Sequence, residues 1–444
     1  MNAQLEPADL ERFAKDFASA PAHRFAQNAV TRTAVEDIAL DRAVVTSTNH
    51  SMSHLIDDWA VTNQKQSGRC WLFAGLNLLR KGAAEQMGLK DFEFSQNHLL
   101  FWDKLEKANH WLEAIIFTAD RDADDRTVAH LLGGPAEDGG QWNMFVALVR
   151  KHGLVPQSVM PETHSSSKTF SLNRALSQLL RRAARDLRTA AAAGEDVEQL
   201  RAAKADVLVT AHRILSIHLG TPPGRFTWQW ADKDKVFHRD EETTPLQFAA
   251  RYACLPVEEY VCIVHDPRGT SEVGRTYTVE YLGNVVGAAP VAYLNVDMDL
   301  VRRLAADALV AGDPVWFGCD TARMDHAELG YWDAALYDFE GVYGADLDLD
   351  KADRLVHGDT LMTHAMLFTG VDIVDGAPRR WRVENSWGPD KADKGFWTMN
   401  DNWFGEHVFE IAVRRDALPA HLQAALEAEP VVLPAWDPMG ALAR

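Results

Sequence analysis

A single cysteine stands where a polar turn gives way to an apolar helix, in the stretch TNQKQSGRCWLFAG from Thr62 to Gly75. A thiol attacks carbonyl carbons as the thiolate, and a free cysteine with a pKa of about 8.5 is mostly protonated at neutral pH. The unsatisfied N–H groups at a helix start favour a negative charge nearby. Cys70 is therefore a candidate nucleophile if the helix begins at this residue.

A nucleophilic thiol also needs a neighbouring base, and the strand-like segments late in the chain offer one. His364 lies in LMTHAMLFTG, a short apolar run in which a charged ring needs a partner. Asn385, in RVENSWG, could accept the N–H of that ring and fix the tautomer that faces the sulfur. Trp387 could shield this hydrogen bond from water. The expected pair is a Cys70 thiolate beside a His364 imidazolium.

Gln64 lies six residues before Cys70. Its side-chain amide and the Cys70 backbone N–H could form the two donors that stabilise an oxyanion. Each residue alone has a simpler explanation, because lone cysteines and histidines are common in cores and an asparagine can make a turn. Their joint appearance, in the order Gln, Cys, His and Asn, favours a catalytic set.

The composition fits an ordinary globular enzyme. The 444 residues are 47% hydrophobic and 25% charged, and the net charge of −19 repels phosphate backbones and anionic lipid surfaces. Nucleic acid is therefore a disfavoured partner, and no apolar run approaches the roughly 18 residues that a membrane span needs. The four cysteines form no CxxC pair. We therefore expect a reducing cytoplasmic setting, with no metal and no cofactor.

The elements that must position these residues change in character along the chain. Before residue 165 the pattern is helical, with helices expected from Cys70, after Ser95 as N-cap, and in EDGGQWNMFVALVRKHGLVP. The segment RAVVTSTNHSMSH, by contrast, is predicted to be extended. From residue 257 the apolar runs are short and typical of strands, as in YVCIVHDPR, PVWFGCD and THAMLFTGVDIV. Helices first and strands later indicate an α+β fold.

Residues 165–256 are predicted to form a helical insertion between these two halves. Apolar residues recur with helical spacing in SLNRALSQLLRRAARDLRTAAAA and in DVEQLRAAKADVLVTAHRILSIHLG, which predicts two helices joined around Gly194. The arginines of the first helix could contact nucleic acid, but a solvated face or a subunit contact is the commoner explanation.

The motifs NQKQSGRCW, THAM and ENSWG together resemble those of papain-like cysteine peptidases, and within them the bleomycin hydrolase and aminopeptidase C family. The similarity extends to FWDKLEKAN, DGGQW, GTPPGRFTW, YTVEYLGNVVG, PVWFGCD and LPAWDPMGALA, so it spans nearly the whole chain. Arg69 stands where the papain signature has serine or alanine. Cys70 and His364 are 294 positions apart, about twice the papain spacing, and a helical insertion typifies the bleomycin hydrolase branch.

The resemblance implies a cysteine aminopeptidase that acts on peptides, with Cys70, His364, Asn385 and Gln64 in the roles given above. It divides the chain into a helical half (1–164), the insertion (165–256), a β-rich half (257–430) and a C-terminal arm (431–444). In this family the arm enters the cleft and limits the enzyme to N-terminal residues, so Ala443 and Arg444 are expected to meet the substrate amine. The family also forms ring-shaped homohexamers.

Some features leave alternatives open. Gly139 and Gly140 could leave room for substrate backbone beside the cleft, and an ordinary glycine turn explains them equally well. The catalytic set could also belong to another acyl transferase, such as a transglutaminase or deamidase. A peptidase-like nucleic-acid-binding protein is a further alternative, since some relatives bind DNA, but the acidic net charge disfavours it.

Overall fold

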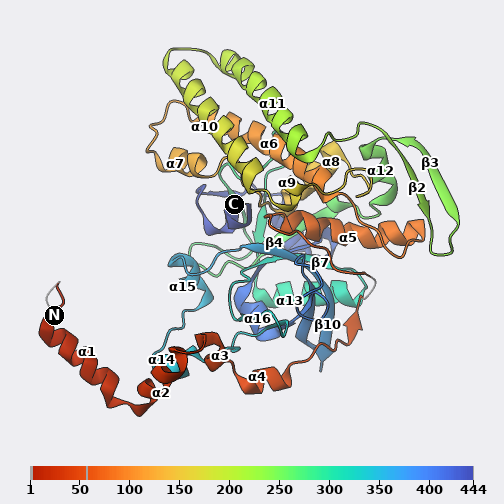
Figure 1. Ribbon diagram of the computed structural model, residues 1–444. Coiled ribbons are helices and arrows are strands. Elements are labelled where there is room, and N and C mark those ends of the chain that lie inside the picture. Colours follow the sequence, from red (N-terminus) through yellow and green to blue (C-terminus); the bar gives the residue numbers. More distant parts are fainter. Residues whose placement is uncertain (1–3, 57–58, 444) are drawn as a thin grey trace.

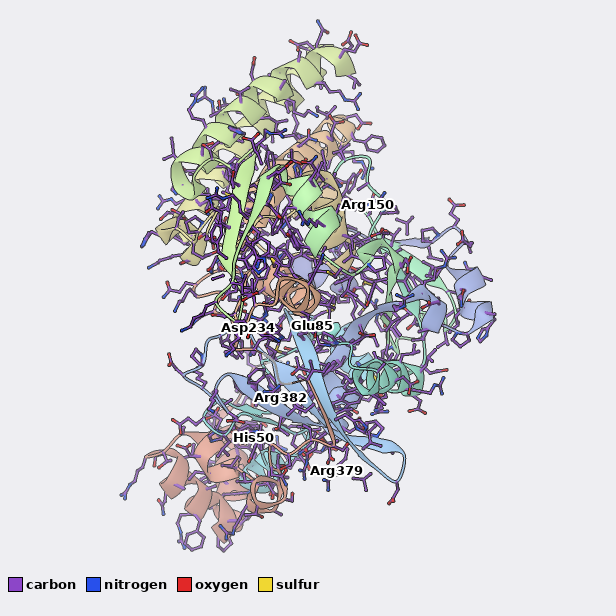
Figure 2. The ribbon with its side chains drawn as sticks, turned by 90° about the vertical axis from the view of Figure 1, so that its right-hand side faces the viewer. His50, Glu85, Arg150, Asp234, Arg379 and Arg382 are labelled. Atoms are coloured by element: carbon purple, nitrogen blue, oxygen red, sulfur yellow. The ribbon has the colours of Figure 1, made fainter. Side chains whose placement is uncertain are left out.

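The computed structural model describes residues 4–56 and 59–443. A helical half and a sheet-containing half face one another, and the C-terminal segment lies between them (Figure 1). Figure 2 shows the same division from the side, with the helix that bears Glu85 lying between the upper helices and the strands below. That helix, α5 (Cys70–Met87), is the element that joins the halves, because it contacts strands of the sheet as well as other helices.

The helical half is built around two long buried helices. Its elements are α5 (Cys70–Met87), α6 (Gln96–Phe117), α7 (Arg126–Gly133) and α8 (Trp142–His152). As predicted, α5 begins at Cys70 and Ser95 caps α6, with its hydroxyl accepting a hydrogen bond from the His98 N–H. Gly88 ends α5 with a φ of +62°, in the left-handed region that suits glycine.

The insertion contains the predicted helical hairpin and one element that was not predicted. The elements are α9 (His164–Ser167), α10 (Phe170–Ala192), α11 (Val197–Leu219), β2 (Phe226–Ala231), β3 (Phe237–Thr243) and α12 (Pro245–Tyr252). The β2–β3 hairpin corrects the expectation of an all-helical insertion. It forms because Trp228 and Trp230 stack on one another and reach the C-terminal end of α5, where the Trp230 indole N–H donates to the Met87 carbonyl.

The arginines of α10 are used inside the chain. Arg181 donates to the carbonyls of Leu132 and Gly133, and Arg188 donates to the carbonyl of Thr118 at the end of α6. These bonds satisfy carbonyls at helix ends, which have no partner within their own helix. They give two of the five arginines of α10 a structural role and leave less of a basic face than the sequence suggested.

The second half is a mixed twelve-stranded sheet. Its strand order is β14-β5-β6-β4-β13-β7-β10-β11-β12-β9-β8, with β1 added beside β10. Its strands are β1 (His54–Leu55), β4 (Tyr260–Val264), β5 (Thr276–Val279), β6 (Tyr293–Asn295), β7 (Val315–Cys319), β8 (Asp325–His326), β9 (Tyr331–Trp332), β10 (His364–Val374), β11 (Ala377–Glu384), β12 (Phe396–Asn400), β13 (Val408–Arg414) and β14 (Val431–Leu433). One face packs on α5 and the other on α13 (Met298–Val310) and α16 (Asp401–His407). Three strand pairs, β9–β12, β4–β6 and β5–β14, are parallel, whereas the sequence suggested an antiparallel series.

Between residues 7 and 47 the chain forms four helices, of which α1 leads away from the body (Figure 1). They are α1 (Pro7–Ser19), α2 (Pro21–Val30), α3 (Val35–Ala39) and α4 (Arg42–Ser47). The helix α4 corrects the prediction of an extended RAVVTS segment. Asp41 nucleates it, since its carboxylate accepts hydrogen bonds from the N–H groups of Ala43 and Val44.

Shorter helices complete the chain: α14 (Phe339–Tyr343), α15 (Lys351–Val356), α17 (Ala420–Ala425) and the 3-10 helices η1 (Val257–Glu259), η2 (Arg415–Ala417) and η3 (Pro438–Ala443). In the described ranges no helix is long and apolar enough to cross a bilayer.

Candidate active site

Cys70 lies at the first turn of α5 and is 4% exposed. Its sulfur is 3.5 Å from the backbone N–H of Ala365, which donates to it. Ala365 follows His364 at the start of β10, so folding brings the cysteine and the histidine segments together across the interface of the two halves. Arg69, which stands just before the cysteine, is fully buried and its guanidinium forms a two-bond ion pair with Glu162, at 2.9 Å and 2.7 Å. That pair fixes the polar turn that leads into the helix.

His364 and Asn385 are in direct contact. The His364 Nε2 and the Asn385 Oδ1 are 3.0 Å apart, and both side chains are buried. The hairpin of β10 and β11 creates this contact, because its register pairs Leu367 with Glu384 and so places both residues at the same end. The Trp387 ring lies 5.0 Å from the His364 ring, centroid to centroid.

Gln64 is held beside the same strand end. Its backbone N–H donates to the Ser386 carbonyl, and its side-chain carbonyl accepts the Ser386 hydroxyl at 2.5 Å. Its side-chain nitrogen donates one hydrogen to the Ser67 carbonyl, also at 2.5 Å, and a second hydrogen remains. The amide orientation is thus determined by Ser386, a residue whose role the sequence analysis missed.

Burial opposes the charged forms of both reactive groups. It raises the pKa of the Cys70 thiol to about 11, while the N–H groups of Ala365, Trp71 and Cys70 itself act to lower it. It also lowers the pKa of His364 to about 4, against the hydrogen bond that the ring donates to Asn385, which acts to raise it. An isolated charge on either group is therefore disfavoured, and the ion pair expected from the sequence depends on both charges forming together.

A buried polar cluster joins the three segments that carry the site, and no pattern in the sequence indicates it. Asn77 and Arg80 of α5 both donate to Glu384, at 2.7 Å and 2.9 Å. Asn77 also donates to the Thr62 hydroxyl, two residues before Gln64. Glu384 directly precedes Asn385, so this cluster links the Gln64 segment, the nucleophile helix and the Asn385 strand.

Gly139 and Gly140 are buried rather than open to a cleft. The Gly139 carbonyl accepts a hydrogen bond from the Lys107 ammonium, with an N–O distance of 2.5 Å. A Cβ at Gly140 would lie 2.4 Å from Cε2 of the Trp71 indole, so close packing requires glycine there. The contacts at these two glycines fit the structural alternative better than a role in substrate binding.

The C-terminal arm lies between the two halves (Figure 1). β14 pairs with β5, Asp437 forms a two-bond ion pair with Arg268, and the Met439 carbonyl accepts the Tyr293 hydroxyl. Ala443 and Gly440 line a cavity of about 410 Å³ whose other walls come from α6, α7 and residues 280–283. Cys70 and His364 are not among the residues that line this cavity. Arg444 lies outside the described residues.

Comparison with known proteins now adds the family. The sequence matches the Peptidase C1-like family over residues 4–440. The chain belongs to this family. It is 41% identical to the bleomycin hydrolase of Homo sapiens over 454 residues, which cover 100% of this chain and 99% of the relative. It is 38% identical to the aminopeptidase C of Listeria innocua over 443 residues, with 100% of both chains covered.

A solved structure extends the similarity to three dimensions. The crystal structure of PepW from Lactobacillus rhamnosis HN001 superposes with a TM-score of 0.97 at 42% identity and covers 99% of each chain. The Peptidase C1-like membership confirms the resemblance to the bleomycin hydrolase and aminopeptidase C branch and the prediction that the chain is an enzyme. The α+β, papain-like fold is likewise confirmed.

Proposed function

We propose that this cysteine aminopeptidase cleaves peptides through Cys70, with His364 as the proton carrier, Asn385 as its orienting partner and Gln64 as an oxyanion donor. The observation that supports this most directly is the placement of the Cys70 sulfur against the Ala365 N–H while His364 is bonded to Asn385. These two contacts support the assignment of a nucleophile, a base and a residue that orients the base.

The reaction proceeds in two steps. His364 accepts the thiol proton as the Cys70 sulfur attacks the peptide carbonyl carbon, so the two charges arise side by side and offset the burial that disfavours each alone. The oxyanion accepts two hydrogen bonds, one from the remaining N–H of the Gln64 side-chain amide and one from the Cys70 backbone N–H. His364 then gives its proton to the leaving amine. A water that His364 deprotonates hydrolyses the thioester and restores the thiol.

Hydrolysis of aminoacyl-coumarin substrates tests this assignment. Cys70→Ala should abolish release of the free amino acid and of the coumarin, whereas Cys254→Ala, at the exposed cysteine, serves as the matched control and should retain activity. Transfer of the aminoacyl group to an added amine without hydrolysis would instead indicate an acyl transferase. Full turnover by the Cys70→Ala enzyme would exclude the mechanism.

The C-terminal arm limits the cleft to the N-terminal residues of substrates. Three contacts hold it in place: the Asp437–Arg268 ion pair, the Tyr293 hydroxyl on the Met439 carbonyl, and the Arg126 guanidinium 4.0 Å above the Trp436 ring. With the arm in the cleft, a substrate has space for few residues before the scissile bond, and Ala443 and Arg444 would lie close to its amine.

Removal of residues 441–444 tests the role of the arm. The shortened enzyme should cleave peptides with blocked N-termini, which the full-length enzyme should leave intact. An unchanged requirement for a free N-terminus would contradict the role of the arm.

Arg444 itself could be removed by the enzyme's own activity. Intact-mass measurement of the wild type and of Cys70→Ala tests this, and an identical C-terminus in both proteins would argue against autocatalytic removal.

Assembly and location complete the proposal: a homohexamer in the cytoplasm. The helices α1 and α2 support association, because they bury no residue in the chain and carry exposed apolar side chains: Leu10, Phe13, Phe17 and Phe25. Light scattering should give six times the chain mass of 49.5 kDa. A monomer mass would contradict the assembly.

A further inference from the structure

The peptide unit between Ser67 and Gly68 holds the side chain of Gln64. Its carbonyl accepts a hydrogen bond from the Gln64 side-chain nitrogen at 2.5 Å. Its N–H points the opposite way, because the carbonyl and the N–H of a trans peptide lie on opposite sides of one plane. Any group that fixes the direction of the Gly68 N–H therefore also fixes the carbonyl that binds Gln64.

Asp138 is the group that accepts this N–H. Its Oδ2 lies 2.9 Å from the Gly68 nitrogen. A Cβ at residue 68 would lie only 2.8 Å from the Asp138 Cβ, so glycine permits this close approach. The Asp138 backbone carbonyl accepts a second hydrogen bond from the Trp71 indole N–H, also at 2.9 Å. Asp138 thus contacts the chain two residues before Cys70 and one residue after it.

The Asp138 carboxylate is itself firmly held, and the residue is 8% exposed. The Lys104 ammonium lies 2.6 Å from Oδ1, and the Asn173 amide donates to the same oxygen at 2.8 Å. The Thr169 hydroxyl donates to Oδ2 at 2.5 Å. Burial acts to raise the pKa of Asp138, but the Lys104 charge and the hydrogen bonds hold it well below its usual range. Gly68 therefore has a fixed and charged acceptor at neutral pH.

We propose that Asp138 is a positioning residue for the reaction, which orients the Gln64 amide through the Ser67–Gly68 peptide unit. Without the carboxylate, this peptide unit is free to rotate, and its carbonyl then leaves the Gln64 nitrogen. The amide keeps only its bond to Ser386 and no longer directs its remaining N–H at the oxyanion. The inference rests on the proposed role of Gln64 as an oxyanion donor.

The effect of Asp138 on the nucleophile has the opposite sign. Burial raises the pKa of the Cys70 thiol, and the negative charge of Asp138 acts in the same direction. The carboxylate thus disfavours the thiolate while it holds the turn that carries the oxyanion donor. Loss of the charge should therefore help the thiolate to form and harm the step that needs the oxyanion donor, and these two effects can be measured separately.

Hydrolysis of aminoacyl-coumarins by Asp138→Asn measures the loss of the oxyanion donor. The single oxygen of the new amide is drawn to the Lys104 ammonium, so its NH2 group faces the Gly68 N–H and accepts nothing from it. We expect kcat to fall by about tenfold or more, with KM changed by less than about twofold. Wild-type kcat in Asp138→Asn would overturn the inference.

Asn173→Leu is the matched control. It removes a hydrogen bond from the same carboxylate but leaves the bond to Gly68 in place. Tm should fall, while kcat should stay within about twofold of the wild type. A fall in kcat equal to that of Asp138→Asn would show that general loosening around the carboxylate is sufficient, and would overturn the inference.

A second variant guards against misfolding of Asp138→Asn. Lys104→Met combined with Asp138→Leu removes both members of the buried ion pair, so neither charge is left unpaired. It also removes the acceptor of the Gly68 N–H, so kcat should fall as in Asp138→Asn. Wild-type kcat in this double variant would contradict the inference as well.

Alkylation by iodoacetamide separates the oxyanion donor from the nucleophile. The alkylation of Cys70 forms no oxyanion, and it is measured in the Cys254→Ala background because Cys254 is exposed. Its second-order rate in Asp138→Asn should equal or exceed that of the parent, since a charge that opposes the thiolate is lost. A rate that falls in parallel with kcat would mean that Asp138 acts on Cys70 itself, and would refute the path through Gln64.

A double-mutant cycle with Gln64→Ala tests that path directly. In the Gln64→Ala background, Asp138→Asn should lower kcat by less than about twofold more, because the group that Asp138 orients is already absent. A full additional loss would overturn the inference. If Gln64→Ala itself leaves kcat unchanged, the proposed role of Gln64 fails and the inference fails with it. If Gln64→Ala lowers kcat and Asp138→Asn does not, the inference alone fails.

Discussion

Loss of the buried Arg80–Glu384 pair should destabilise the fold and misplace the catalytic groups. The Arg80 guanidinium is 2.9 Å from the Glu384 carboxylate, and the two side chains are only 3% and 4% exposed. Removing one member of such a pair leaves an uncompensated buried charge, which typically costs about 3–5 kcal/mol. Arg80→Leu should therefore lower the free energy of unfolding by about that amount. It should also lower kcat, because Glu384 precedes Asn385.

The loss of unfolding free energy in Arg80→Leu should depend on pH with a definite sign. Burial raises the pKa of Glu384, and the Arg80 charge acts to lower it. Without Arg80 the pKa of the folded state rises further above the value of the unfolded chain. A group with a raised acidic pKa destabilises the fold increasingly as pH rises through that pKa. Arg80→Leu should therefore cost less stability at pH 5, where the carboxyl is more protonated, than at pH 8.

Urea unfolding at pH 5 and pH 8 measures the free energy of unfolding that Arg80→Leu loses and the change of that loss with pH. Lys81→Met is the matched control on the same helix, because the Lys81–Glu85 contact is 3.6 Å long with side chains 28% and 61% exposed. Such surface pairs contribute less than about 1 kcal/mol. A loss for Arg80→Leu no larger than that of the control, or one that grows as pH falls, would refute the reasoning.

Three further predictions concern single residues. Ser386→Ala frees the Gln64 carbonyl, so kcat should fall on the order of tenfold with little change in KM or in Tm, measured with aminoacyl-coumarins. Burial lowers the pKa of His98 to about 4, so the fold should lose stability as pH falls from about 6.5 to 4, and His98→Gln should reduce that loss in urea titrations. Gly140→Ala should lower the unfolding free energy by about 1–3 kcal/mol, since its Cβ would collide with the Trp71 indole.

Much of the site could be predicted because local rules determine it. The change from polar turn to apolar run fixes where α5 begins, and therefore where Cys70 lies. The contact of His364 with Asn385 follows from a hairpin whose two-residue turn, Asp375 and Gly376, has φ of +52° and +81°, as Asp-Gly turns prefer. The register of this hairpin brings the two strand ends together, and the two side chains meet there although His364 and Asn385 are not directly paired.

Other features depend on contacts that no local pattern shows. Asn77 and Arg80 look like ordinary helix residues, and only the packing of α5 on β11 makes them partners of Glu384. The segment Arg42–Ser47 is rich in β-branched residues, which suggested an extended chain, yet one aspartate cap and the neighbouring helices make it helical.

The distance of 294 residues between Cys70 and His364 carries little structural cost for two reasons. The α10–α11 hairpin of the insertion packs on α6, and Arg181 of α10 donates to carbonyls at the end of α7. The entropy of closing a loop also grows only with the logarithm of its length. The proposed catalytic contact therefore depends on the packing of α5 against β10 and on the Glu384 cluster rather than on the length of the intervening chain. Perturbations of that cluster should then affect the reaction more than changes at the tip of the hairpin near Gly194.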